Sequence, residues 1–96
     1  MQTIDLDLSG CYDRKTLHAH LKRGLDLPPY YGGNLDALHS ELISFTEQTH
    51  IRLRYALDDG IFSDYIRRLL QVFEDAAEEN PRLTVEFLRP PSGGQG

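Results

Sequence analysis

The chain has 96 residues, of which 40% are hydrophobic and 26% are charged, as expected for one small globular domain with a modest core. Fifteen acidic against ten basic side chains leave a net charge of −5. This balance argues against a nucleic-acid backbone as the main partner, since phosphate binding needs a basic patch, and it suits a basic partner. A single cysteine excludes an intramolecular disulfide and a zinc site built from thiolates.

The N-terminal part predicts a strand followed by a helix. The first residues carry two acids and no long apolar run, so we expect no signal peptide, no membrane span and a cytoplasmic location. Residues 3–8 alternate between apolar and polar side chains, which predicts a strand with one buried face. Asp13 is the expected N-cap of a helix over about 14–24. Its leucines recur every four residues, and Gly24 is expected to begin its exit.

The most unusual stretch is Leu-Pro-Pro-Tyr-Tyr-Gly-Gly-Asn-Leu-Asp-Ala-Leu, residues 27–38. Its two prolines stiffen a loop, and its two glycines, Gly32 and Gly33, supply backbone freedom. Asn34 is the expected N-cap of a helix over about 34–45. The spacing predicts a core face on this helix and a separate outward face. The core face consists of Leu35, Leu38, Leu42 and Phe45, and the outward face of Asp36, His39, Ser40 and Ile43.

The rest of the chain predicts a strand, a helix and a strand. Residues 50–55 alternate, and a turn signal follows at 58–60. A long helical pattern over 62–79 has Ser63 as its expected N-cap. Residues 83–87 alternate again. We therefore expect one domain over 1–89 and a flexible C-terminal tail over 90–96, which has no apolar side chain to bury.

The resulting order β-α-α-β-α-β predicts an α/β fold with a parallel sheet, because the strands are separated by helical crossovers. All three strands alternate, whereas a sheet covered on both faces would show continuous apolar runs. We therefore expect a two-layer sandwich, in which helices cover one face of a three-stranded parallel sheet.

The sequence argues against a metal site and a catalytic site. His18 and His20 point about 160° apart on a helix, and the other two histidines lie in different elements, so no metal or other cofactor is expected. Neither a nucleophile elbow nor a phosphate-binding loop is present. An enzyme that uses Asp36 and His39 is the weaker alternative.

A protein-binding surface is the favoured interpretation. It comprises the tyrosines of the stiff loop and the outward face of the following helix. Rigid aromatic and interspersed polar side chains are typical of interface hot spots, and a stiff loop loses little entropy on binding. The competing interpretation is that both tyrosines, Tyr30 and Tyr31, cap the edge of the core, or that one of them does.

The stretch 27–38 closely resembles the signature of the barstar family, intracellular protein inhibitors of bacterial ribonucleases. The similarity extends over nearly the whole chain, including Leu17-His18 with Leu21-Lys22 and the helical segment 69–76. The resemblance implies a three-stranded parallel sheet with helices on one face. It also implies that the second helix and the loop before it enter the active-site cleft of a ribonuclease, where acidic side chains take the place of substrate phosphate.

By this resemblance the partner is a small basic ribonuclease, the free chain is a monomer, and the role is that of an antitoxin or immunity protein. Four positions depart from the family pattern: Ser40 replaces its dominant acid, His39 and Phe45 replace tryptophans, and Asp75 is a shorter acid. A barstar-like interaction module for a basic partner other than a nuclease is therefore the alternative. The expected partner-binding residues are Tyr30, Tyr31, Gly32, Asn34, Leu35, Asp36, His39, Ser40, Ile43, Phe45 and Asp75.

Overall fold

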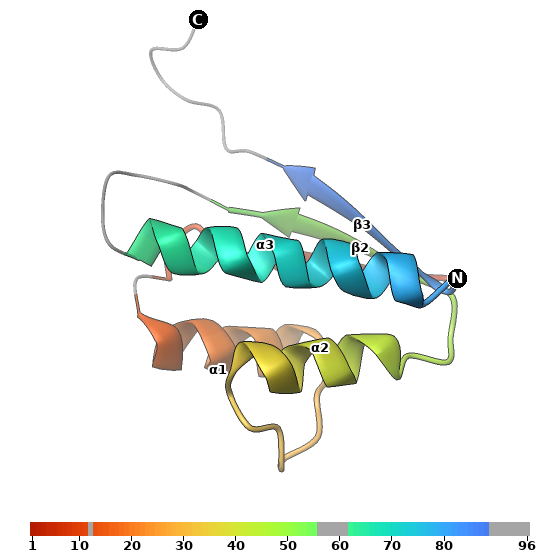
Figure 1. Ribbon diagram of the computed structural model, residues 1–96, viewed down its shortest axis with the longest axis horizontal. Helices are drawn as coiled ribbons and strands as arrows, with labels where there is room; N and C mark the ends of the chain where they lie inside the picture. The colour runs from red at the N-terminus through yellow and green to blue at the C-terminus, as the bar shows by residue number, and fades with distance from the viewer. Residues whose placement is uncertain (12, 56–61, 89–96) are drawn as a thin grey trace, which may run out of the picture.

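The computed structural model describes residues 1–11, 13–55 and 62–88. Its elements follow the predicted order (Figure 1). They are β1 (Gln2–Asp7), α1 (Arg14–Gly24), α2 (Leu35–Ile43), β2 (Thr49–Arg54), α3 (Phe62–Glu79) and β3 (Leu83–Leu88). The predicted turn at 58–60 and the predicted tail at 90–96 lie outside the described residues. Among the described helices, none combines the length and the apolar character needed to cross a membrane.

The three strands form one parallel sheet with β2 in the centre. In register, Ile51 of the central strand lies between Ile4 and Val85, and Leu53 lies between Leu6 and Phe87. These side chains face the helical layer and belong to the core or pack against it. The predicted two-layer α/β sandwich is thus confirmed.

The opposite face of the sheet is polar and open to solvent. Arg52 in the central strand lies between two acids, at 3.6 Å from Asp5 and 3.7 Å from Glu86. His50 makes a 2.7 Å hydrogen bond with Thr84 on the same face. Such exposed ion pairs contribute little to stability, but they explain why the strands alternate rather than being apolar throughout.

The core consists mainly of leucines from the helices and central strand. Its fully buried members include Leu17 and Leu21 of α1, Leu38 and Leu42 of α2, Ile51 and Leu53 of β2, and Leu69 and Phe73 of α3. Each helix therefore contributes side chains spaced three or four residues apart, which is the periodicity of one helix face.

Helix α1 has the predicted bounds, from Arg14 to Gly24. The Asp13 carboxylate accepts a 2.7 Å hydrogen bond from the Thr16 backbone N–H, which confirms the N-cap. At the other end the residue with positive φ is Asp26 (φ 54°), not Gly24, which is still helical. Gly24 is needed for another reason, because a Cβ there would collide with the Leu6 side chain of β1.

Helix α2 begins at the predicted cap and ends two residues before the predicted end. Asn34 Oδ1 accepts a 2.8 Å hydrogen bond from the Ala37 backbone N–H. Gly33, directly before the cap, has φ +71°, a backbone conformation in which a residue with a side chain would be strained. The helix stops at Ile43, and its last carbonyls bind the side chain of Asn80 instead of continuing the helical pattern.

Replacing Asn34 by alanine should lower the free energy of unfolding by about 1 kcal/mol, because the Ala37 N–H then loses its acceptor. Urea unfolding followed by far-UV circular dichroism measures this loss. Asn34→Asp is the matched control, since aspartate caps equally well and should keep the stability within about 0.5 kcal/mol of the unsubstituted chain. Equal stability of the alanine variant would show that the cap contributes nothing here.

Helix α3 starts at Phe62, so Ser63 is its second residue and the predicted N-cap at Ser63 is wrong. Ser63 is buried within the first turn of the helix. The helix spans 62–79 as predicted, and its buried face includes Tyr65, Ile66, Leu69, Phe73 and Ala76.

Candidate protein-interaction surface

The two tyrosines of the loop over residues 28–33 have different environments. The Tyr31 backbone N–H donates a 3.0 Å hydrogen bond to the Pro28 carbonyl, which closes a turn. Tyr30 lies within this turn, and 81% of it is exposed. Tyr31 is half-buried and packs against the core. Tyr31 therefore anchors the loop, while Tyr30 is the aromatic side chain presented to solvent.

Tyr31 is anchored by a buried histidine. His18 Nδ1 lies 2.7 Å from the Tyr31 hydroxyl, and His18 Nε2 lies 2.6 Å from the hydroxyl of Tyr65. Because these residues come from α1, the loop and α3, the His18–Tyr31–Tyr65 network joins three segments. Arg14 covers the Tyr65 ring, with its guanidinium carbon 4.4 Å from the ring centre.

The network holds its imidazole neutral. Burial, and then the positive charge of Arg14, lower the pKa of His18. Burial raises the pKa of Tyr31, and the negative charge of Glu41 on α2 acts in the same direction. A neutral imidazole has one donor and one acceptor nitrogen, so one tyrosine hydroxyl donates to the ring and the other accepts from it. Both ring nitrogens of the buried His18 are therefore hydrogen-bonded, and their bonds fix the loop on the core.

Three of the four residues predicted for the outward face of α2 are exposed. Asp36 and Ser40 are exposed, and Ile43 is 39% exposed. Leu35 and Phe45, by contrast, are partly buried and pack against the core, so each can offer only part of its surface to a partner. Asn34 and Gly32 are exposed at the start of the helix.

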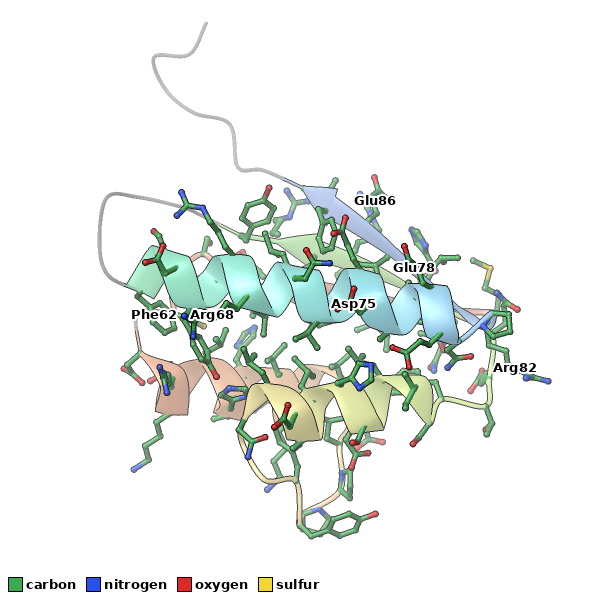
Figure 2. All side chains as sticks on the ribbon, in the orientation of Figure 1. Phe62, Arg68, Asp75, Glu78, Arg82 and Glu86 are labelled. Carbon is green, nitrogen blue, oxygen red and sulfur yellow. The ribbon has the colours of Figure 1, made fainter. Side chains whose placement is uncertain are left out.

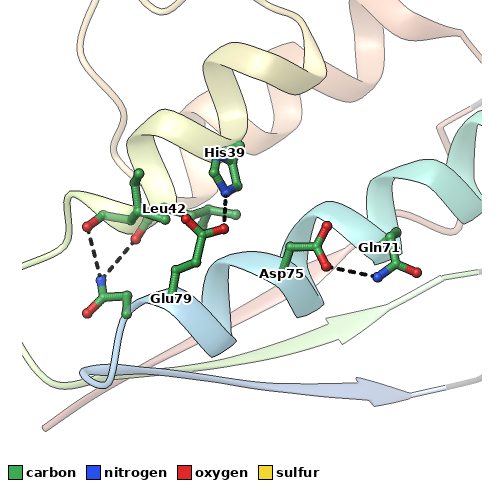
Figure 3. A network of polar contacts seen from close by, with 7 residues as sticks. His39, Leu42, Gln71, Asp75 and Glu79 are labelled. Carbon is green, nitrogen blue, oxygen red and sulfur yellow. Dashed lines mark hydrogen bonds and ion pairs between the residues drawn. The ribbon is translucent and has the colours of Figure 1, made fainter.

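His39 faces α3 rather than pointing freely into solvent. Its Nε2 lies 2.7 Å from Glu79 Oε2, and Figure 3 shows the two side chains meeting between α2 and α3. Glu79 therefore places a carboxylate beside His39, between α2 and α3. In Figure 2, Asp75 lies along the same helix, and its carboxylate accepts a 3.0 Å hydrogen bond from the Gln71 side chain. Asp75 and Glu79 are four residues apart, so they share one face of α3.

Asn80, directly after α3, also connects this helix to α2. Its Nδ2 donates to the carbonyls of Leu42 and Phe45 at 3.1 Å each and approaches that of Ile43 at 3.4 Å. Its Oδ1 accepts from the Arg82 backbone N–H at 3.0 Å. The end of α3 thus fixes the C-terminus of α2, and with it the position of the outward face.

Within the part of the chain that the structure describes, no three potential metal-ligating side chains lie together. Cys11 is buried, and burial raises the pKa of its thiol, which disfavours the reactive thiolate form.

Sequence reasoning missed the contributions of His18, Glu79 and Asn80. His18 follows Leu17 on the buried side of α1, so its place beside the leucine stripe is the signal that indicates burial. Glu79 and Asn80 act on residues about forty positions earlier, and no local pattern indicates such contacts.

Two comparisons place the chain among known proteins. A family model described as "Barstar (barnase inhibitor)" matches residues 1–88. A protein of Bacillus subtilis (strain 168), named "Putative ribonuclease inhibitor YrdF", is 32% identical over 81 residues, which cover 82% of this chain and 89% of that protein. The family match over residues 1–88 includes the loop with its exposed tyrosine and the helices that hold this loop. The chain therefore belongs to the barstar family.

Proposed function

We propose that the chain is an inhibitor that binds a bacterial ribonuclease and covers its active site with loop 28–33 and helix α2. The observation that carries the proposal is the arrangement at the start of α2. There, Tyr30 is exposed on an anchored loop, and Asp36 is exposed in the first helical turn. Family membership, and the description of the relative as a ribonuclease inhibitor, support the same function.

The physical basis is complementarity to a cationic cleft. A ribonuclease active site binds phosphate through basic side chains, and a carboxylate such as Asp36 can bind the same groups through charge-assisted hydrogen bonds. The net charge of −5 favours encounter with a basic protein. Tyr30 supplies a large side chain with few rotatable bonds, so its immobilisation costs little entropy. In this proposal the chain acts in the cytoplasm as a monomeric antitoxin or immunity protein and catalyses no reaction.

Inhibition assays against a panel of small, basic bacterial ribonucleases test the proposal. We expect at least one enzyme to be inhibited stoichiometrically, with an inhibition constant that rises with salt concentration. Any ribonuclease encoded beside this chain belongs in the panel. If none of the enzymes is inhibited, the proposed function is wrong.

Tyr30→Ala and Asp36→Ala should each raise the inhibition constant at least about tenfold, as expected for central interface residues. Asp5→Ala is the matched control, because it removes the same charge as Asp36→Ala but lies on the open face of the sheet. It should change the constant less than about threefold, through long-range attraction alone. Equal effects of the two aspartate variants would mean that α2 does not form the interface.

A second candidate function is binding of a basic protein that is not a nuclease. The observation in its favour is that Ser40, exposed in the middle of α2, offers no carboxylate. Ser40→Asp bears on the first function, because the added acid should tighten binding to a ribonuclease whose cleft carries a cation at that point. Affinity capture that returns only partners without a nuclease fold would favour the second function.

A further inference from the structure

A basic pocket lies beside the proposed interface, between α1 and the loop that leads to α2. It has a volume of about 360 Å3. Three cationic side chains contribute to its lining, and none of the described residues that line it is acidic. The lining consists of Arg14, Lys15, His18, Ala19, Lys22, Tyr31 and Gly33. On a chain with five more acids than bases, this local excess of positive charge is unusual.

Two of the three cations are held in place. The Arg14 guanidinium lies over the Tyr65 ring, and Lys22 Nζ lies 3.5 Å from the Pro29 carbonyl oxygen. Lys15 and Lys22 are seven residues apart, so they lie on the same face of α1, two turns from each other. The floor of the pocket includes His18 and Tyr31, which fix one another. An anion that enters the pocket therefore meets an Arg14 guanidinium whose freedom is already reduced by its contact with Tyr65.

The pocket is continuous with the proposed binding surface. Tyr31 and Gly33 belong both to its lining and to the segment that carries the exposed Tyr30 into α2. A protein that covers Tyr30 and Asp36 would bring its edge over this pocket. The volume exceeds that of a single carboxylate, so the methylene groups of an acidic side chain can pack along the lysine stems.

We propose that the pocket receives an acidic side chain of the partner protein, at the edge of the interface formed by loop 28–33 and α2. This inference rests on the proposed function. It gives the interface two signs of charge: an acidic region on α2, which meets the cationic cleft, and a basic pocket, which meets a carboxylate beside that cleft. Such a pattern fixes the orientation of the complex and distinguishes among basic ribonucleases that differ in this one acid. A nucleic-acid phosphate suits the pocket less well, because the net charge of −5 repels a polyanion.

The sign of the charge effect provides the test. For a ribonuclease that the chain inhibits, we expect the Arg14→Gln, Lys15→Gln and Lys22→Gln variants each to weaken binding about fivefold to tenfold. A chain that merely faces a basic protein would bind it more tightly after losing a cation. Arg82→Gln is the matched control, since Arg82 is exposed at the far end of α3, and it should leave binding unchanged or tighten it. Unchanged or tighter binding of all three pocket variants would overturn the inference while leaving the inhibitor function intact.

A second measurement does not need the partner. Capped glutamate (N-acetyl-glutamate amide) and its neutral analogue, capped glutamine, are titrated at millimolar concentration into the 15N-labelled full chain. Capped glutamate should shift the amide signals of Ala19, Lys22 and Gly33, and Lys22→Gln should abolish the shifts. Absence of shifts, or equal shifts with capped glutamine, contradicts the inference. If uridine 5′-monophosphate binds at least tenfold more tightly than capped glutamate, the pocket takes phosphate and the inference is likewise wrong.

Discussion

Replacing Asn80 by alanine should lower the free energy of unfolding by about 2–3 kcal/mol, the largest change in stability that we expect from a single polar substitution in this chain. Asn80 is buried, and its amide donates to carbonyls at the end of α2. Without it, the carbonyls of Leu42 and Phe45 lose the Asn80 donor, and the Leu42 carbonyl keeps a longer 3.4 Å hydrogen bond from the Phe45 backbone N–H. A buried acceptor without a partner costs more than the hydrogen bond contributed.

Urea unfolding at neutral pH measures the change, and two controls isolate its cause. Asn80→Asp keeps an oxygen that can accept from the Arg82 N–H but removes the donor, so it should be at least as destabilising as alanine. Gln71→Ala removes an exposed amide of α3 that binds only the Asp75 carboxylate in the described structure, and it should cost less than about 0.5 kcal/mol. A loss below 0.5 kcal/mol for Asn80→Ala would mean that solvent satisfies the end of α2 equally well.

The same substitution connects folding to the proposed function. Because Asn80 fixes the end of α2, its loss should loosen Phe45 and the outward face before the whole domain unfolds. Hydrogen exchange of the α2 amides in Asn80→Ala should therefore accelerate more than that of the β2 amides, which pair with strands on both sides. Equal acceleration in α2 and β2 would mean that the domain responds as one unit.

Much of the fold was predictable because its signals are local. The alternation of residues 3–8, 50–55 and 83–87 identified three half-buried strands and hence a sheet covered on one face. Asp13 and Asn34 were recognised as N-caps because a cap acts on an N–H only three residues away. The boundaries differed where the deciding contact was distant: α2 ends at Ile43 because Asn80, nearly forty residues later, binds its carbonyls.

The candidate surface was predictable only in part. Tyr30 and Tyr31 are identical neighbours, and the sequence left open which of them packs on the core. The turn from Pro28 and the hydrogen bond to His18 decide this in favour of Tyr31. His39 was placed on the outward face by helical periodicity, which does not show that Glu79 of α3 reaches it. The basic pocket could not be predicted from the sequence either. The net charge of −5 describes the whole chain and does not show that three cations line one pocket beside α1.

Mild acid should destabilise this protein before its carboxylates are protonated, because of His18. In the folded state, burial and the Arg14 charge lower the pKa of this imidazole below its usual value of about 6.5, whereas the unfolded chain keeps that value. As the pH falls below about 6.5, the unfolded state therefore binds a proton that the folded state rejects. Stability is fully present above this pH and is lost as the pH falls toward the folded pKa, with a slope of at most about 1.4 kcal/mol per pH unit for one proton.

The network explains why protonation is unfavourable. A charged imidazole donates from both nitrogens, so the Tyr31 and Tyr65 hydroxyls must both accept, and whichever hydroxyl donated to the ring must find another acceptor. The cation would also lie near Arg14, whose charge repels it. The buried site thus penalises His18 protonation through both its hydrogen bonds and its charge.

The measurement is the free energy of unfolding in urea from pH 8 to pH 5, for the unsubstituted chain and for His18→Gln. Glutamine can donate and accept but does not titrate. The variant should be less stable at pH 8, where the neutral network is intact, and should lose less stability than the unsubstituted chain on going to pH 5. Parallel curves for the two proteins would assign the acid sensitivity to other groups. Because His18 holds Tyr31, the loop that presents Tyr30 should weaken in the same pH range, so any inhibition by the unsubstituted chain should fall more steeply with acid than inhibition by His18→Gln.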